Sequence, residues 1–436
     1  MLRVWVTAGI LSLLAVLSQA ADALDAVTHS EFPPTDMELA LLGRDLFFDP
    51  LLSGNLNISC ATCHQPSLGT ADAVSLSLGE GALALGADRH AGARNPPQAR
   101  IPRNAPALFN LGAYEFTTLF HDGRTQTDPT APFGIRMPPG RALERPLPSV
   151  LAAQALLPLQ SRDEMAGNPG ENAIADAVAA ERIGGPDGAW ALVAARVASN
   201  PIYAERFAAL IGPRDLHITD IARALAEFSG YEFRSTDSPF DAYLGGDRTA
   251  LSPQQKRGLA LFEDKAGCSG CHSGRYQTDH EFHALALPQF GPGKDADGYS
   301  DTGRYYVTGL EEDRYRFRTP SLRNVALTAP YGHNGAYATL AGIVRHHLDP
   351  VAGLAGFDRS QVRLPAAPEG ADDWRVMEDF DEVMRIAESA EITPVQLSDG
   401  EIADILAFLA ALTDPAAGKG RLGAPTRVPS GLPIDR

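Results

Sequence analysis

The chain has 436 residues, of which 44% are hydrophobic and 21% are charged, a composition typical of a globular protein. Its formal net charge of −17 argues against nucleic acid or an anionic membrane as a partner, because both require a cationic face, and is compatible with a basic partner protein. The length predicts two domains, or three at most, and the 41 Gly and 33 Pro residues predict long loops.

The first residues have the features of a secretory signal peptide. Arg3 provides a positive charge, residues 6–17 form a short apolar run, and small residues follow up to Ala20. The run is shorter than the ~20 apolar residues that span a bilayer, which counts against the alternative of an N-terminal anchor. We predict a signal peptide at residues 1–20, cleaved after Ala20 or Ala23, and a mature protein in the periplasm without a membrane span.

Two predicted helices share the pattern G-x-x-L-F-x-D, at residues 43–49 and 258–264. The first helix begins at residue 35 or 36. The second begins after Ser252, which forms the start of a capping box with Gln255. A cysteine motif follows each helix, so the two helices indicate a repeated unit.

Every cysteine in the chain lies in one of two C-x-x-C-H motifs, at residues 60–64 and 268–272. This spacing is the attachment signature of haem c, because two thiols bind the vinyl groups of one haem and the adjacent His binds its iron. A zinc site would have to join motifs more than 200 residues apart, and a thioredoxin-like redox pair would need a βαβ context that the sequence lacks. The residues predicted to hold two covalently bound haem c groups are Cys60, Cys63, His64, Cys268, Cys271 and His272.

Most other periodic stretches predict helices, and alternating strand patterns are scarce. The predicted fold class is therefore mainly α, with two cytochrome c-like haem domains in tandem, related by duplication, and long loops. The predicted helices lie at residues 149–157, 173–180, 188–199, 218–228 and 401–412.

The duplication is predicted from motifs that recur in the same order. Residues 106–110 and 320–324 both read P-x-L-x-N, and each is followed by a His, an Asp or Asn, and a Gly. We predict an N-terminal haem domain at residues 35–240, a C-terminal haem domain at residues 250–413 and a flexible tail at residues 414–436.

From about residue 35 to residue 412 the chain resembles bacterial dihaem cytochrome c peroxidases and their relatives of the methylamine-utilisation (MauG) type. The most specific stretch is FRTPSLRNVALTAPYGHNG at residues 317–335, which closely matches the hallmark of the second haem domain in that family. The resemblance implies that the N-terminal haem reacts with peroxide and that the C-terminal haem handles electrons.

The resemblance assigns His64 and His272 as proximal iron ligands, and it places Gln154 and Glu164 beside the peroxide haem. Splitting peroxide requires a group that moves a proton between its two oxygens, which a carboxylate can do and an amide cannot. Glu164 is therefore expected to be catalytic, and Gln154 to orient peroxide or water. Without the family pattern, Glu164 would read as a solvated carboxylate at a helix end.

A calcium ion between the haem domains is also implied by the resemblance. Its protein oxygens map to the Asn104 side chain and to the carbonyls of Thr328 and Pro330, and hard oxygen ligands suit calcium. Residues 103–106 alone would read as an ordinary turn, so this prediction depends wholly on the resemblance.

The second ligand of the electron-transfer iron departs from the family pattern. Conventional members have a Met and MauG-type members a Tyr where this chain has His347. We expect His347 to be the distal ligand, which gives a lower potential than a Met ligand. The adjacent His346 is the rival, because neighbours on a helix differ by about 100° and only one can face the iron. Two surface histidines are the remaining interpretation.

Two further departures concern the bridge between the haems and the cap on the peroxide haem. His121 stands before Asp-Gly-Arg, where the family usually has a Trp as inter-haem bridge. An imidazole is a poorer redox relay, so we expect weaker coupling or another route, unless His121 only binds a haem propionate. Glu80 stands where many conventional members have a capping His, and His90 could substitute. We expect an open, five-coordinate iron.

These features predict a periplasmic dihaem peroxidase that reduces hydrogen peroxide to water, with electrons from a small cytochrome c or cupredoxin entering through the C-terminal haem. The missing Met and capping His also fit a MauG-type enzyme that uses peroxide to oxidise side chains of a partner protein. A non-catalytic electron-transfer cytochrome is the third alternative and predicts two six-coordinate haems. The family is often dimeric, which leaves a homodimer open.

Overall fold

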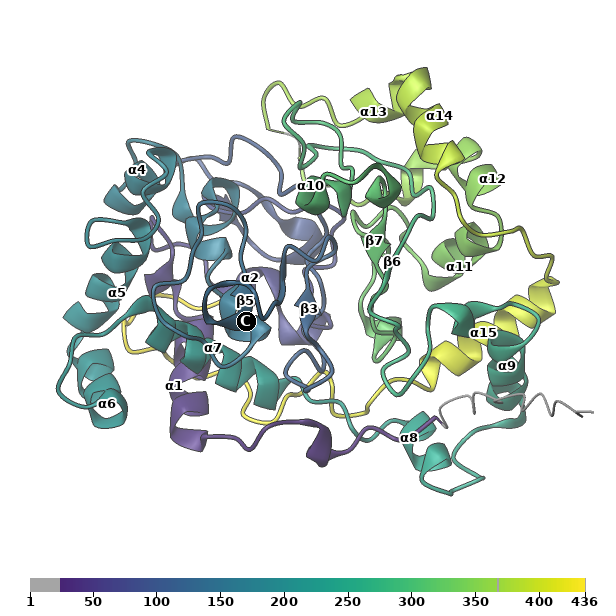
Figure 1. The fold of residues 1–436 in the computed structure, drawn as a ribbon, viewed down its shortest axis with the longest axis horizontal. Coiled ribbons are helices and arrows are strands. Elements are labelled where there is room, and N and C mark those ends of the chain that lie inside the picture. The colour runs from purple at the N-terminus through teal and green to yellow at the C-terminus, as the bar shows by residue number, and fades with distance from the viewer. Residues whose placement is uncertain (1–23, 367, 436) are drawn as a thin grey trace, which may run out of the picture.

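The periodic stretches of the sequence form helices close to the predicted boundaries. This computed structural model describes residues 24–366 and 368–435, with an N-terminal half (purple to teal in Figure 1) beside a C-terminal half (green to yellow). The predicted signal peptide and its cleavage site lie outside the described residues. The strands that form are two or three residues long, as expected for a mainly α fold.

The helices of the described residues are α1 (Met37–Phe48), α2 (Cys60–Cys63), α3 (Val150–Gln154), α4 (Ala173–Ala179), α5 (Ala189–Ser199), α6 (Pro201–Ile211), α7 (Ile218–Glu232), α8 (Pro239–Leu244), α9 (Pro253–Glu263), α10 (Tyr305–Thr308), α11 (Leu340–Leu348), α12 (Pro350–Ala355), α13 (Arg375–Glu378), α14 (Phe380–Glu388) and α15 (Asp399–Ala410). The strands pair antiparallel in three small sheets: β1 (Ala82–Leu83) with β2 (His90–Ala91); β3 (Thr118–Leu119), β4 (Thr125–Thr127) and β5 (Ile135–Arg136) in that order; and β6 (Phe282–His283) with β7 (Phe317–Arg318).

Local sequence signals explain where the first long helix of each half begins. Asp36 accepts a hydrogen bond from the Leu39 amide at the start of α1. Ser252 and Gln255 cap α9 reciprocally, as predicted. Within each half, the capped helix packs against a later helix, α1 on α7 and α9 on α15.

Glycine allows both helix pairs to approach closely. A Cβ on Gly43 would lie 1.8 Å from the carbonyl oxygen of Ala224, and a Cβ on Gly258 would lie 1.9 Å from that of Asp404. Neither site has room for a side chain. The glycine of each G-x-x-L-F-x-D pattern is therefore required by the packing of its helix.

The asparagine of each P-x-L-x-N motif makes an equivalent contact in its own half. Asn110 accepts a hydrogen bond from the Ser235 amide at 2.7 Å, and Asn324 accepts one from the Asp414 amide at 2.8 Å. Both asparagines have a left-handed backbone, with φ of 62° and 61°, which Asn tolerates better than most residues. Each motif thereby ties its loop to the segment just after α7 or α15.

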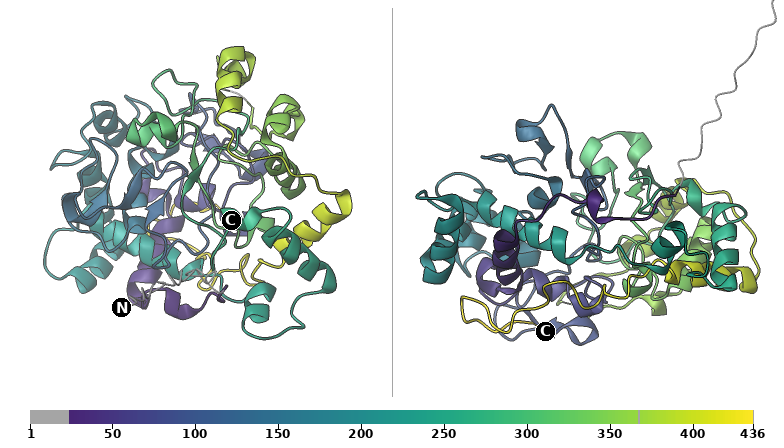
Figure 2. Two further views of the ribbon diagram at one scale, coloured as in Figure 1. Left: turned by 45° about the vertical axis from the view of Figure 1, so that its right-hand side comes forward. Right: turned by 90° about the horizontal axis from the view of Figure 1, so that it is seen from below.

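The C-terminal segment differs from its prediction. Residues 414–435, here called the C-terminal strap, run back from α15 to the N-terminal half, where the yellow segment lies in Figures 1 and 2. Val428 is 4% exposed and belongs to the core of that half. Glu232 at the end of α7 accepts hydrogen bonds from the backbone amides of residues 421–423. The expected flexible tail is therefore packed.

The strap reaches the first cysteine motif. Ser430 donates a hydrogen bond to Asp49, just after α1, at 2.6 Å. The hydroxyl of Thr62, between the two cysteines of the motif, donates to Asp435 at 2.5 Å. The end of the chain thus contacts the segment that is expected to hold the first haem.

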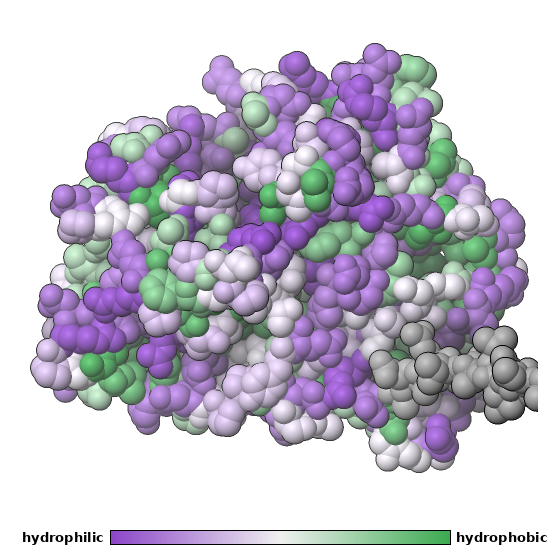
Figure 3. Space-filling view, in the orientation of Figure 1, coloured by the Kyte–Doolittle hydropathy of each residue, from purple (hydrophilic) through white to green (hydrophobic). Residues whose placement is uncertain are grey.

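On the face drawn in Figure 3, hydrophilic residues dominate, with apolar residues scattered between them. Among the described residues, no helix combines the length and the apolar character that crossing a bilayer requires.

Candidate functional site

The first C-x-x-C-H motif forms a single helical turn, α2, with His64 immediately after it. Burial raises the pKa of the Cys60 and Cys63 thiols to about 12, and neither cysteine forms a disulfide. The Nδ1 of His64 donates to the carbonyl of Thr70 at 3.0 Å, and burial lowers the pKa of this imidazole. A neutral ring with Nδ1 engaged has Nε2 available for a metal.

The second motif repeats this arrangement in a 3-10 turn, Cys268–Gly270. The Nδ1 of His272 donates to the carbonyl of Gln277 at 3.0 Å. Burial and the neighbouring His347 lower the pKa of His272 to about 4, so this ring is also neutral at physiological pH. Burial raises the pKa of the Cys268 thiol to about 11. Both motifs therefore present the donor set that haem c requires.

His347 on α11 faces His272 across a gap. Their ring centroids are 6.4 Å apart, and the Nδ1 of His347 donates to the Ile343 carbonyl at 2.8 Å. Two imidazoles on opposite sides of one metal ion, each bonded at about 2 Å, have centroids roughly 6 Å apart. The pair therefore fits one iron between the two rings.

His346 points elsewhere. Its Nδ1 bonds to the hydroxyl of Tyr337 at 2.7 Å, and its Nε2 bonds to the carbonyl of Leu285, also at 2.7 Å. Both ring nitrogens are engaged and the side chain is buried. Of the two adjacent histidines, only His347 is positioned to face His272.

A cavity of about 520 Å³ surrounds the second motif and extends to the N-terminal half. Most of its walls are apolar, which suits a porphyrin ring. Cys268, Cys271, His272 and His347 line it from the C-terminal half, and Gln154 at the end of α3 lines it from the N-terminal half. The cavity therefore joins the second haem-binding motif to one of the residues expected beside the first.

Glu164 lies in a π-helical turn, Arg162–Ala166, a conformation that is rare and frequent at functional sites. Its half-buried carboxylate acts on the pKa of both His64 and Cys63, which places it within electrostatic range of the first motif. A Cβ on Gly79 would lie 1.9 Å from the Asp163 carbonyl oxygen, so the loop before Glu80 packs directly on this turn. Among the described residues, no hydrogen bond joins Glu164 to Gln154.

The two residues considered as caps of the first iron have other contacts. Glu80 is 4% exposed, and its Oε1 accepts a hydrogen bond from the Asn55 amide at 2.8 Å. His90 is exposed on β2, with Nδ1 bonded to the carbonyl of Asp88. Buried Arg89 between them donates to the carbonyl of Gly79 and so holds this loop.

The three expected calcium ligands line the same cavity. Asn104 comes from the N-terminal half, Thr328 and Pro330 come from the C-terminal half, and all three line its wall. The Nδ2 of Asn104 donates to the carbonyl of Val74 at 2.7 Å, and among the described residues no donor reaches its Oδ1. This arrangement leaves an amide oxygen available for a hard cation.

A buried charge cluster joins the two halves next to this wall. Arg103 from the N-terminal half bonds to Asp122 and to Asp301 of the C-terminal half, each at 2.7 Å, with all three side chains at most 6% exposed. Burial alone would raise the pKa of both carboxyls, but the Arg103 guanidinium outweighs it and holds their pKa values below the usual range. The cluster fixes the position of one half against the other.

His121 lies half-buried beside that cluster. Its Nε2 bonds to the carbonyl of Asn104 at 3.3 Å, and burial together with Arg103 lowers the pKa of His121 to about 3. His333, from the matching motif of the other half, also lines the cavity and stacks on Phe317 with centroids 3.7 Å apart. The two H-x-G motifs therefore meet at the boundary between the halves.

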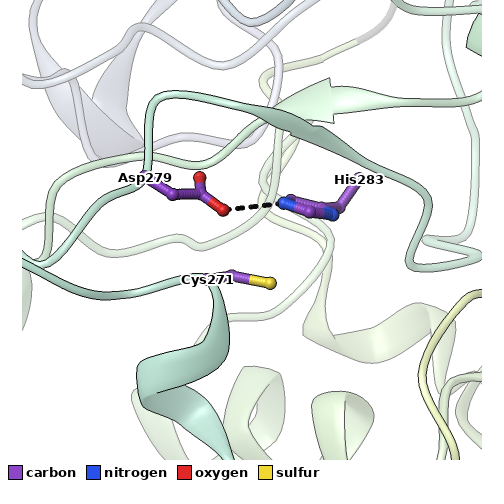
Figure 4. Close-up of side chains that lie close together, drawn as sticks. All are labelled: Cys271, Asp279 and His283. Carbon is purple, nitrogen blue, oxygen red and sulfur yellow. Dashed lines mark hydrogen bonds and ion pairs between the residues drawn. The ribbon is translucent and has the colours of Figure 1, made fainter. Parts of the chain in front are cut away.

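Three side chains with metal-binding atoms lie together at the second motif, as Figure 4 shows. Their ligand atoms are within 4.8 Å of one another, and the Nε2 of His283 lies 2.9 Å from Asp279. The third is Cys271, whose sulfur is expected to bind the second haem. Cys271 and His283 of this group line the cavity around the motif.

Sequence reasoning missed Lys294, which lies in a Gly- and Asp-rich loop of the C-terminal half without a motif. Burial and the neighbouring Arg124 lower the pKa of Lys294 to about 8, and Glu164 counteracts them. A cation from one half thus lies within electrostatic range of the expected catalytic carboxylate of the other. Nothing short of the tertiary structure indicates this proximity.

Comparison with known proteins agrees with this arrangement. A family model described as di-haem cytochrome c peroxidase matches residues 37–249. The cytochrome c551 peroxidase of Pseudomonas aeruginosa is 32% identical over 313 residues, which cover 71% of this chain and 72% of that protein. The chain belongs to the di-haem cytochrome c peroxidase family. The methylamine utilization protein MauG of Paracoccus denitrificans is 30% identical over 428 residues, which cover 92% of this chain and 94% of the relative.

Solved structures of this family have the same fold. A MauG-like protein associated with microbial copper homeostasis matches with a TM-score of 0.59 and 26% identity, covering 92% of this chain and 95% of the other. The diheme peroxidase BthA from Burkholderia thailandensis E264 matches with a TM-score of 0.58 and 24% identity, covering 93% and 91%. As a family member the protein is an oxidoreductase with two haem c groups, and its relatives include both peroxidases and MauG proteins.

Proposed function

We propose that this protein is a periplasmic peroxidase that reduces hydrogen peroxide to water, with electrons from a small cytochrome c or cupredoxin. The difference between the two motifs carries the proposal. His272 faces a second imidazole, His347, whereas the His64 side has the carboxylate of Glu164 within electrostatic range. An iron with two imidazole ligands suits electron transfer, and an iron with a free position beside a proton-transfer group suits peroxide.

Reducing one peroxide molecule to two water molecules consumes two electrons and two protons. The haem at His64, when bound, supplies the iron chemistry that accepts peroxide. Glu164 takes the proton from the oxygen nearer the iron and delivers it to the outer oxygen, which then leaves as water. Gln154 orients peroxide or water through its amide. His272 and His347 hold the haem through which electrons enter.

The test is rapid mixing of the fully oxidised holoprotein with hydrogen peroxide, with no reductant present. A peroxidase with an open first iron reacts at once, and turnover then requires a reduced donor protein. A spectrum that stays unchanged until the second haem is reduced would show a capped iron, with Glu80 or His90 as the ligand. Two six-coordinate haems and no peroxide turnover under any condition would establish a non-catalytic cytochrome.

A MauG-type activity is the second candidate, and the surroundings of the first motif favour it. Glu80 is occupied with the Asn55 amide and His90 is exposed, which supports a first iron that needs no reductive activation. In such an enzyme both haem spectra would change together in a long-lived state after peroxide addition. Side-chain oxidation of a partner protein, without consumption of a small donor, would then decide for this activity.

We also propose one calcium ion at Asn104, Thr328 and Pro330, and an origin of the two halves by duplication. The calcium proposal is supported by the free Oδ1 of Asn104 on the shared wall. Removing calcium with a chelator is expected to lower peroxide turnover and thermal stability, and added calcium to restore both.

The duplication is supported by the matching contacts of Asn110 and Asn324. A solution measurement of mass would test for a homodimer.

A further inference from the structure

Among the described residues, one half-buried cation on the cavity wall has no acidic partner. Arg318 on β7 lines the cavity, donates from Nε to the Phe120 carbonyl at 3.1 Å and from an Nη to the Thr319 carbonyl at 3.3 Å. These acceptors are neutral. Among the described residues, no carboxylate lies within ion-pair distance of Arg318.

A second arginine of the cavity wall, Arg323, differs from Arg318 because it has an acidic partner. Arg323 also lines the cavity, but it pairs with Asp241 at 2.8 Å and is fully buried. Burial lowers the pKa of Arg318 to about 10, and no acidic side chain counteracts it. A charge that is partly withdrawn from water and has no anion beside it is costly, so a site of this kind favours an anion supplied from elsewhere.

We propose that Arg318 binds a propionate carboxylate of the haem held by Cys268 and Cys271. This inference rests on the proposed placement of that haem between His272 and His347. Haem carries carboxylates, the cavity that contains its four protein contacts also contains Arg318, and guanidinium groups bind carboxylates through paired hydrogen bonds. The ligand class is therefore a haem carboxylate, and the site is a single arginine with neutral neighbours.

The position of Arg318 gives this contact a second consequence. The backbone amide of Arg318 donates to the carbonyl of His121 at 2.7 Å, and its Nε donates to the carbonyl of Phe120, so the residue is bonded to the N-terminal half at two points. A carboxylate on Arg318 therefore lies at the boundary between the halves. A carboxylate bound there would link the second haem, through Arg318, to the backbone of Phe120 and His121 in the N-terminal half.

Arg318 also affects the potential of the second haem. A positive charge near the iron disfavours the ferric state, which has one more positive charge than the ferrous state. Replacing Arg318 with Gln removes that charge and is expected to lower the potential. The expected shift is about tenfold in the ferrous-to-ferric ratio at fixed applied potential, or 59 mV for a one-electron couple.

The experiment is a spectroelectrochemical titration of the holoproteins with Arg318→Gln, Arg318→Lys and the control Arg314→Gln. Arg314 pairs with exposed Glu311 on the surface, so its loss should leave both potentials unchanged. Arg318→Lys keeps the charge and should retain most of the potential. Covalent haem content and the low-spin spectrum of the second haem establish that each variant is intact.

Three results would contradict the proposal. These are an unchanged potential of the second haem in Arg318→Gln, an equal shift in Arg318→Lys, and a shift confined to the first haem. If Arg318→Gln fails to mature, the propionate bands in the resonance Raman spectra of wild type and Arg318→Lys decide instead, because a real contact makes them differ. A wild-type second haem that is not low-spin would refute the ligand pair proposed above, while its potential would still report on Arg318.

Discussion

The two C-x-x-C-H motifs are held in the same way and face different residues. In both, the His Nδ1 donates to a backbone carbonyl, and a glycine lets the preceding helix pack closely within its half. Opposite His272 lies the imidazole of His347, whereas the His64 side has the Glu164 carboxylate in a π-helical turn. Local structure repeated in both halves is therefore expected to provide haem attachment. We expect the residue near each histidine, His347 in one half and Glu164 in the other, to determine what the bound iron does.

Removing His347 would leave both halves without a second imidazole opposite the motif histidine. Of the changes considered, it has the largest expected effect on activity. In His347→Ala the second haem loses its second strong ligand, so we expect its low-spin spectrum to be replaced by a high-spin one, and electron entry to fail. The control is His346→Ala, which removes the neighbouring ring while leaving His347 in place. If the second haem stayed low-spin in His347→Ala and became high-spin in His346→Ala, the distal ligand would be His346 instead of His347.

Replacing Glu164 tests the proton-transfer role proposed for this residue near the first motif. Glu164→Gln keeps the size of the side chain and removes its ability to carry a proton, so we expect the peroxide step to slow by about 10²–10⁴-fold. Stopped-flow mixing of the oxidised protein with peroxide measures this rate directly. Asp163→Asn, in the same turn, is the matched control and should keep nearly the wild-type rate. Equal losses in both variants would indicate disruption of the turn instead of loss of proton transfer.

Breaking the buried cluster of Arg103, Asp122 and Asp301 has the next largest expected effect, which is on the free energy of unfolding. Asp301→Asn leaves Arg103 with Asp122 alone, and breaking a buried pair in this way costs about 3 kcal/mol of unfolding free energy. Denaturant unfolding monitored by circular dichroism measures the loss. Glu378→Gln breaks the exposed pair with Arg359 and should cost at most about 1 kcal/mol.

The same cluster predicts how stability depends on pH. The pKa of Asp301 is lower in the folded protein than in the unfolded chain, because Arg103 outweighs the effect of burial. Its contribution is therefore complete above the usual carboxyl pKa of about 3.9 and is lost as the pH falls through the lower folded value. The difference in unfolding free energy between wild type and Asp301→Asn should be constant from pH 8 to about 5. It should shrink below about 4, and a difference that grows there would contradict this sign.

Much of the fold is predictable from the sequence, because capping residues and cysteine spacing depend on near neighbours. The starts of α1 and α9, and the glycine of each helix pattern, follow from such signals. The orientation of the His346 side chain does not follow from such signals. Its two nitrogens are taken by Tyr337 and by the carbonyl of Leu285, which is 61 residues away in the chain. The lack of an acidic partner for Arg318 among the described residues is unpredictable for the same reason, since it depends on every side chain around the cavity.

The packing of the C-terminal strap is the feature that the sequence predicts worst. A substitution in the strap tests whether it stabilises the N-terminal half more than the C-terminal half. A Pro- and Gly-rich segment has no helical period, yet Val428 is buried in the core of the N-terminal half, and Asp435 accepts a hydrogen bond from Thr62 of the first motif. Val428→Ala should lower the unfolding free energy by about 2 kcal/mol, because it removes buried methyl groups. Val351→Ala makes the same change at a 47% exposed site on α12 and should cost less than about 0.5 kcal/mol. Amide hydrogen exchange should quicken in α1 and α7 of Val428→Ala and stay unchanged in α9 and α15. Equal stabilities of the two variants would show that the strap lies on the N-terminal half without stabilising it.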